Sequence, residues 1–166
     1  MAVTIKKVTL WRAEVENQPG VLSGVLGPLA AAGANLQVVM GYRYRGQENK
    51  AAIELGPVSG KKVANAAAQA GFSALPLPTL LVQGDDQPGL GHAIAHALGN
   101  AGINVAFLVA QVVEGQFSAI IAFESDDAAK QATALIKKTV VAAGKNGGAQ
   151  CKICGAAIAG KKAKGK

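Results

Sequence analysis

The sequence predicts an α+β fold that is built twice along its 166 residues. Residues 18–47 align without a gap with residues 87–116, and nine of the thirty aligned pairs are identical. Strand-like runs alternate with helix-like runs in each half. Half of the residues are apolar, which is enough for a packed core. These observations predict two tandem units, residues 1–78 and 79–155, followed by a basic segment at 156–166.

The net charge of +7 is concentrated at the C-terminal end. Residues 1–136 carry nine Lys or Arg against ten Asp or Glu, whereas residues 137–166 carry eight Lys and no acidic residue. No apolar run reaches the roughly 18 residues of a membrane helix. The N-terminus lacks the apolar segment of a signal peptide. We therefore expect a cytoplasmic protein with no membrane association.

The first unit is predicted to begin with a strand over Val3–Val15 that ends at a Pro-Gly turn. A helix follows, with Pro19 at its first position, because its fixed φ suits that place, and with Gly33 as its stop signal. The remaining predicted elements are strands at Asn35–Tyr44 and Lys50–Leu55, a helix at Ser59–Ala70 capped by Ser59, and a short strand at Phe72–Leu77.

The second unit repeats this order of elements. Its predicted elements are a strand at Leu80–Gln83, a helix at Pro88–Ala101, strands at Asn104–Val113 and Gln116–Glu124, a helix from Ser125 or Asp126 to about Val141, and a last strand at Gln150–Ile153. The order βαββαβ, made twice, predicts two antiparallel sheets with helices on one face. This is the split βαβ or ferredoxin-like plan, in which the first two strands lie parallel with another strand between them.

Two motifs recur at equivalent places in the units. They are Glu16-Asn17-Gln18-Pro19-Gly20-Val21-Leu22 with Asp85-Asp86-Gln87-Pro88-Gly89-Leu90, and Gly33-Ala34-Asn35-Leu36 with Gly102-Ile103-Asn104-Val105. In a βαββαβ unit of this length, the motifs resemble those of the ACT domain family. The resemblance covers roughly residues 4–155 and implies a stand-alone tandem ACT protein. It also implies a protein that binds small ligands, mostly amino acids, and regulates a metabolic enzyme without catalysis of its own.

The same motifs supply the candidate ligand site. A helix that starts after Pro-Gly presents unpaired backbone N–H groups and a partial positive charge, which suit a ligand carboxylate. An asparagine amide both donates and accepts hydrogen bonds, and an acidic side chain balances a ligand ammonium group. The predicted ligand-binding residues are Glu16, Asn17, Gln18, Val21, Leu22, Asn35, Asp85, Asp86, Gln87, Leu90, Gly91 and Asn104.

The resemblance implies that the turn and the later asparagine line a ligand site at an interface between ACT units. By position, Asn17 and Asn35 match the contacting residues in the first unit, and Asp86 and Asn104 match them in the second. Val15 stands where some amino-acid-binding members carry a polar residue, which leaves the ligand's identity open. A purely structural interpretation also stays open, because Pro-Gly turns and asparagines after helices are common.

Two pairs of side chains are weaker candidates for metal binding. His92 and His96 share one face of a predicted helix, but the stretch lacks the glutamate of a zinc-protease helix. Cys151 and Cys154 resemble half of a zinc-ribbon knuckle, and a structural zinc takes four ligands. We predict no cofactor and no resident metal, and we expect two ordinary thiols.

The basic C-terminal segment supports an alternative function. A structural or nucleic-acid-associated module would use these lysines and the Cys pair for its contacts. No aromatic residue is interleaved with the lysines to stack on bases, so nucleic acid is not the favoured partner. The chain has no nucleophile elbow, P-loop or dinucleotide fingerprint. The favoured prediction is a homodimeric, non-catalytic amino-acid-binding regulator of an enzyme partner.

Overall fold

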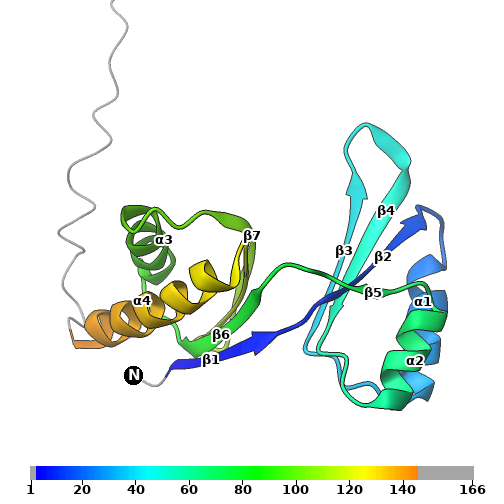
Figure 1. The fold of residues 1–166 in the computed structure, drawn as a ribbon, viewed down its shortest axis with the longest axis horizontal. Coiled ribbons are helices and arrows are strands. Elements are labelled where there is room, and N and C mark those ends of the chain that lie inside the picture. Colours follow the sequence, from blue (N-terminus) through cyan, green and yellow to red (C-terminus); the bar gives the residue numbers. More distant parts are fainter. Residues whose placement is uncertain (1–2, 146–166) are drawn as a thin grey trace, which may run out of the picture.

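The computed structural model describes residues 3–145, which form two four-stranded antiparallel sheets, each covered on one face by two helices (Figure 1). The predicted α+β class, with two ferredoxin-like antiparallel sheets and helices on one face of each, is confirmed. In each sheet the first strand of the unit and the strand after its first helix flank a third strand, as predicted. Among the described helices, none is long and apolar enough to cross a membrane.

The first sheet has the strand order β3-β4-β2-β5. Its strands are β2 (Trp11–Glu16), β3 (Val38–Tyr44), β4 (Gln47–Gly56) and β5 (Ser73–Ala74), and its helices are α1 (Val21–Ala31) and α2 (Lys61–Gln69). Alternation along β2 directs Ala13 toward the helices, where it joins a core with Leu29 of α1 and Ala67 of α2. The opposite face of this sheet carries no helix (Figure 1).

The second sheet has the strand order β1-β6-β8-β7. Its strands are β1 (Val3–Val8), β6 (Thr79–Asp85), β7 (Val105–Val113) and β8 (Gln116–Phe123), and its helices are α3 (Leu90–Asn100) and α4 (Asp126–Lys145). Its core joins Val82 and Ile121 from the sheet to Leu98 of α3 and Ile136 of α4. The free edges of the two sheets include the equivalent strands β3 and β7.

The prediction of one strand over Val3–Val15 was wrong. The first strand ends at Val8, and a second strand begins at Trp11. β1 pairs with β6 of the second sheet, whereas β2 pairs with β4 and β5 of the first. In the ferredoxin-like plan, the last strand of the second unit, predicted at Gln150–Ile153, would pair with β6. In the structure β1 occupies this position. Residues 150–153 lie outside the described part of the chain. The sheet that a strand joins depends on pairing with residues distant in sequence, and the pattern of apolar residues along the strand does not indicate that partner.

The edge strands β1 and β5 occupy corresponding places in the two sheets, but of these two β1 alone crosses to the other unit. Residues 72–77, which contain β5, stand 69 positions after residues 3–8, and β5 closes the first sheet just as β1 closes the second. β1 therefore completes the sheet of the second unit, whereas β5 completes the sheet of its own unit, where a strand was predicted at Phe72–Leu77. Leu10, Leu81 and Ile120 form a small buried cluster where the two connections cross, joined by Val38 and Met40. The two units are thus tied together by two strand connections and an apolar contact.

Both repeated Pro-Gly turns start their helices in the same way. Gly20 and Gly89 are the N-cap residues, with φ of 88° and 83°, a left-handed conformation that strains any side chain. The helices therefore begin at Val21 and Leu90, and the prediction that Pro19 occupies the first helical position was wrong. Ser59 is not a cap either, because Gly60 fills that place, whereas Ser125 caps α4 through a bond from the Ala128 N–H.

Candidate functional site

The turn after β2 is anchored to the β3–β4 hairpin. The backbone N–H of Asn17 donates to the Asn49 carbonyl at 2.8 Å, and its side-chain amide donates to the Glu48 carbonyl at 2.9 Å. Gln18 closes the turn by donating from Nε2 to the Glu16 carboxylate at 2.7 Å. The predicted residues of this turn thus lie together, and all three side chains are exposed.

The turn after β6 has the same shape with different chemistry. The Asp86 N–H donates to the Gly115 carbonyl at 2.7 Å, and the Asp85 carboxylate accepts a hydrogen bond from Gln116 at 2.8 Å. Aspartate at position 86 has no amide to donate, unlike Asn17 at the equivalent place. The second turn therefore presents two exposed carboxylates next to a helix N-terminus, and the two candidate sites are chemically unequal.

The backbone N–H groups of the predicted carboxylate site are partly used within each turn. Val21 donates to the Gln18 carbonyl at 3.3 Å and Leu90 to the Gln87 carbonyl at 3.1 Å. The N–H groups of Leu22 and Gly91 come next, in the first helical turn, where an α-helix offers no backbone acceptor. The side chain of Leu90 is buried in the core, so this residue would meet a ligand through its backbone alone.

Within each unit the predicted asparagine lies far from the turn. Asn104 directly precedes β7 at the end of the sheet where Val105 pairs with Phe123, whereas Asp85 pairs with Gln116 at the other end. Seven residue-to-residue steps along β8 separate Gln116 from Phe123, a distance of about 23 Å. Asn35 is likewise remote from Glu16. The structure gathers the turn residues but does not bring the turn and the asparagine of one unit together.

The predicted metal candidates do not assemble into a site within residues 3–145. His92 and His96 lie exposed on α3 with stacked rings whose centroids are 5.9 Å apart, and His96 Nε2 lies 2.9 Å from the Asn100 amide nitrogen. In this part of the chain no group of three or more His, Cys, Asp or Glu side chains converges. Cys151, Cys154 and the lysines of residues 156–166 lie outside the described residues.

A polar network on the helix-free face of the first sheet was not predicted. The Arg12 guanidinium contacts the Tyr44 hydroxyl, the Glu14 carboxylate at 3.3 Å and the buried Glu54 carboxylate at 3.6 Å. Glu54 also accepts a hydrogen bond from the Tyr42 hydroxyl at 2.7 Å. The sequence contained one sign of this network, which is the glutamate within the apolar run Ala51–Leu55. A carboxylate buried in such a strand needs a cation or a hydrogen-bond donor beside it.

The network changes the proton affinity of two of its members. Burial raises the pKa of Tyr42 to about 12, and its hydrogen bond to the Glu54 carboxylate and that group's charge act in the same direction. Burial by itself lowers the pKa of Arg12, but the Tyr44 hydrogen bond and the nearby acidic groups outweigh it and raise this pKa. Arg12 therefore stays a cation and Tyr42 stays a neutral donor at physiological pH.

Several solved structures have a fold similar to that of this chain. No family model and no curated protein matches the sequence. The regulatory subunit of aspartate kinase from Thermus thermophilus is similar over 84% of this chain and 97% of its own, with a TM-score of 0.57 and 16% identity. The aspartokinase alpha and beta subunits match over 85% and 98%, with a TM-score of 0.58 and 16% identity. This chain has the tandem ACT fold.

A protein from Bacteroides thetaiotaomicron shares the fold with a TM-score of 0.66 and 14% identity, over 82% of this chain and 90% of that one. At such identities the likeness concerns the fold. In both units the motifs that carried the resemblance occupy equivalent places: Gly20 and Gly89 start the first helices, and Gly33 and Gly102 end them with positive φ.

Proposed function

We propose that this tandem ACT protein is a non-catalytic regulator that binds a free amino acid between units of two associated chains. The observation that carries the proposal is the separation of the turn from the asparagine within each unit, because a site that uses both groups needs two units. The similarity of the fold to regulatory subunits of aspartate kinase supports a regulatory role. We further propose that ligand binding alters the activity of a separate enzyme.

Antiparallel pairing of edge strands brings the two halves of the site together. β7 runs from the asparagine end of its sheet to the turn end. When two β7 strands pair antiparallel around a two-fold axis, the turn end of one unit lies beside the asparagine end of its partner. The first-turn N–H groups of one chain would then bind the ligand carboxylate, and Asn104 of the partner would bind its other polar group.

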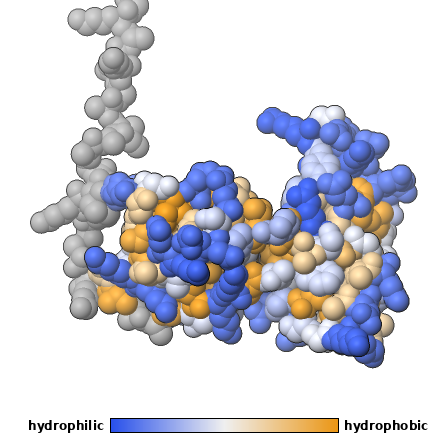
Figure 2. All heavy atoms as spheres, in the orientation of Figure 1, coloured by the Kyte–Doolittle hydropathy of each residue, from blue (hydrophilic) through white to orange (hydrophobic). Residues whose placement is uncertain are grey.

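The surface of β7 supports this association. Its nine residues include no charged side chain, and Leu108, Val109, Val112 and Val113 are 46–59% exposed. Figure 2 shows apolar surface on the part of the second unit where Figure 1 places β7. A long, exposed, apolar edge strand is a site for pairing with another strand. The one irregularity in the pairing of β7 with β8 lies at its start, between Val105 and Phe107, and the strand is regularly paired from Phe107 to Val113. We therefore propose a homodimer that is closed through β7.

Introducing a charge on this edge is expected to separate the chains. Val109→Lys places an ammonium group where two β7 strands would meet, so the mass measured by light scattering should fall from twice 16.7 kDa to 16.7 kDa. Val141→Lys on α4 is the matched control, because both valines are 46% exposed. A wild-type chain that is monomeric at about 100 μM, well above a micromolar Kd, would contradict the dimer.

A thermal-shift screen of the twenty amino acids tests ligand binding directly. A ligand present at about 100 times its Kd should stabilise the protein by roughly 2.7 kcal/mol, which corresponds to a rise in Tm of roughly 5–10 °C. The Asn35→Ala/Asn104→Ala variant should lose this rise. Asn100→Ala, an exposed asparagine outside the candidate site, is the control that should keep it. If no amino acid raises the Tm, the sensing role loses its support.

A further inference from the structure

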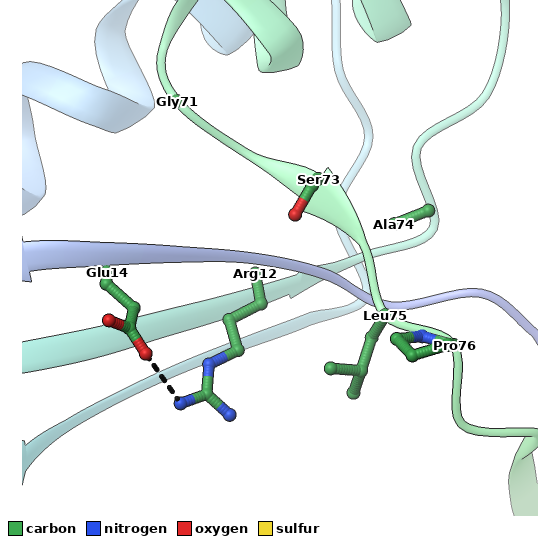
Figure 3. Close-up of a pocket in the computed structure, with 7 residues that line it drawn as sticks. All are labelled: Arg12, Glu14, Gly71, Ser73, Ala74, Leu75 and Pro76. Carbon is green, nitrogen blue, oxygen red and sulfur yellow. Dashed lines mark hydrogen bonds and ion pairs between the residues drawn. The ribbon is translucent and has the colours of Figure 1, made fainter.

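A second candidate ligand site lies away from the turns, on the helix-free face of the first sheet. A groove of about 410 Å³ runs beside β5, and Arg12, Glu14, Ser73, Leu75 and Pro76 line it (Figure 3). Arg12 and Ser73 are directly opposite each other in the β2–β5 ladder, so their side chains share this face. β5 is only two residues long, which leaves the β2 edge next to Glu14 uncovered.

The Arg12 guanidinium is held in place before any ligand arrives. Glu54 is buried beneath it, the Tyr44 hydroxyl accepts from Nη2, and the Tyr44 ring lies 5.9 Å from the guanidinium carbon. The guanidinium has five N–H donors in a rigid fork, and its contacts to residues 3–145 use only Nη1 and Nη2. A group already fixed in this way loses little conformational freedom when it binds a ligand.

The charges of the groove match a zwitterion better than a simple anion. Two carboxylates, Glu14 and Glu54, surround the one cation, so the cluster has an excess negative charge. A ligand with only a carboxylate would add to that excess, whereas a zwitterion adds no net charge and its ammonium group can pair with the Glu14 carboxylate. Figure 3 shows the Arg12 side chain between the Glu14 carboxylate and the apolar side chain of Leu75.

We propose that this groove binds the ammonium and carboxylate groups of a free α-amino acid with an apolar side chain. The ligand carboxylate accepts from the remaining Arg12 donors and the Ser73 hydroxyl, and its ammonium donates to the Glu14 carboxylate, which is two-thirds exposed and is held in place by Arg12 and the Tyr44 hydroxyl. Leu75 and Pro76 contact the ligand side chain. These two residues belong to the connection from β5 to β6, so an occupied groove restrains the link between the two ACT units.

The site is tested by titrating L-leucine into the full chain and following backbone amide signals by NMR. Shifts are expected at Gly71, Ser73 and Leu75, with saturation at concentrations up to roughly 10 mM. Glu14→Gln and Ser73→Ala, both at exposed positions, should each weaken binding about tenfold or more. Glu48→Gln is the matched control, because Glu48 is an exposed glutamate paired with Arg43 outside the groove.

Two chemical controls and one variant separate this site from the interface site. Leucine methyl ester lacks the carboxylate charge and N-acetyl-leucine lacks the ammonium, so each should bind at least tenfold more weakly. The Asn35→Ala/Asn104→Ala variant should keep the groove shifts even where the interface site is lost. Absence of shifts at the groove residues, or equal binding of leucine and N-acetyl-leucine, would overturn the proposal without touching the interface site.

Discussion

Removal of residues 1–8 is expected to destabilise the second ACT unit by on the order of 5 kcal/mol or more, a large part of the stability of a small domain. β1 supplies a full edge of the second sheet, with Val3–Val8 paired to Thr79–Gly84. Val3 and Ile5 pack against its core, and β1 also contacts α4. Loss of β1 exposes these apolar groups and leaves the backbone of β6 unpaired on one side. Hydrogen exchange should therefore accelerate across residues 79–123.

A point substitution separates the effect of the strand from that of chain length. Ile5→Asp places a carboxylate against the core of the second unit and should cost about 3 kcal/mol in urea denaturation. Thr4→Asp adds the same side chain to the exposed face of the same strand and should cost less than about 0.5 kcal/mol. Adding back a peptide of residues 1–9 should restore the slow exchange of β6. Unchanged exchange in the truncated chain would show that β1 does not hold the sheet together.

The internal repeat explains why so much of the fold was predictable. The Pro-Gly turn before the first helix and the Gly-x-Asn motif after it occur in both units, so the sequence indicates the bounds of this helix twice. Gly46 and Gly115, at the turns of the two equivalent hairpins, both have positive φ. The exchange of β1 was missed because Val3–Val15 reads as one continuous strand and its partners lie some seventy positions away. The repeat itself contained a sign of this separate strand. At the offset of 69 residues, β6 aligns with Trp11–Glu16, so residues 3–8 lie outside the first strand of the repeated unit.

The candidate sites were less predictable for a different reason. The turn residues are neighbours in sequence, so their clustering follows from the chain itself. The distance between Asp85 and Asn104 depends on the length of α3, which carries the chain to the opposite end of the sheet. The Arg12 cluster depends on the register of three strands, because Arg12 of β2 lies opposite Glu54 of β4, and β3 adds Tyr42 and Tyr44, only in the pairing found here. Register is set by the packed core and not by any short motif.

Loss of the Arg12 side chain is the second large effect that we expect. Arg12→Met leaves the Glu54 carboxylate buried with the Tyr42 hydroxyl but without its cation, and breaking a buried ion pair in this way costs about 3–5 kcal/mol. Glu14 is exposed and paired with the same guanidinium, so Glu14→Met should cost less than about 1 kcal/mol. Urea denaturation followed by circular dichroism measures the free energy of unfolding of each variant relative to the wild type.

The double variant Arg12→Met/Glu54→Met decides whether the cost comes from the unpaired charge. Replacing a whole buried ion pair with apolar side chains of similar size is often close to neutral, so the double variant should recover most of the stability that Arg12→Met loses. Tyr42 is 43% exposed, so its hydroxyl can then bond to water. Additive losses would instead mean that Arg12 and Glu54 contribute independently through packing. A coupling of about 2 kcal/mol or more would identify Glu54 as the residue that holds the Arg12 guanidinium beside the groove.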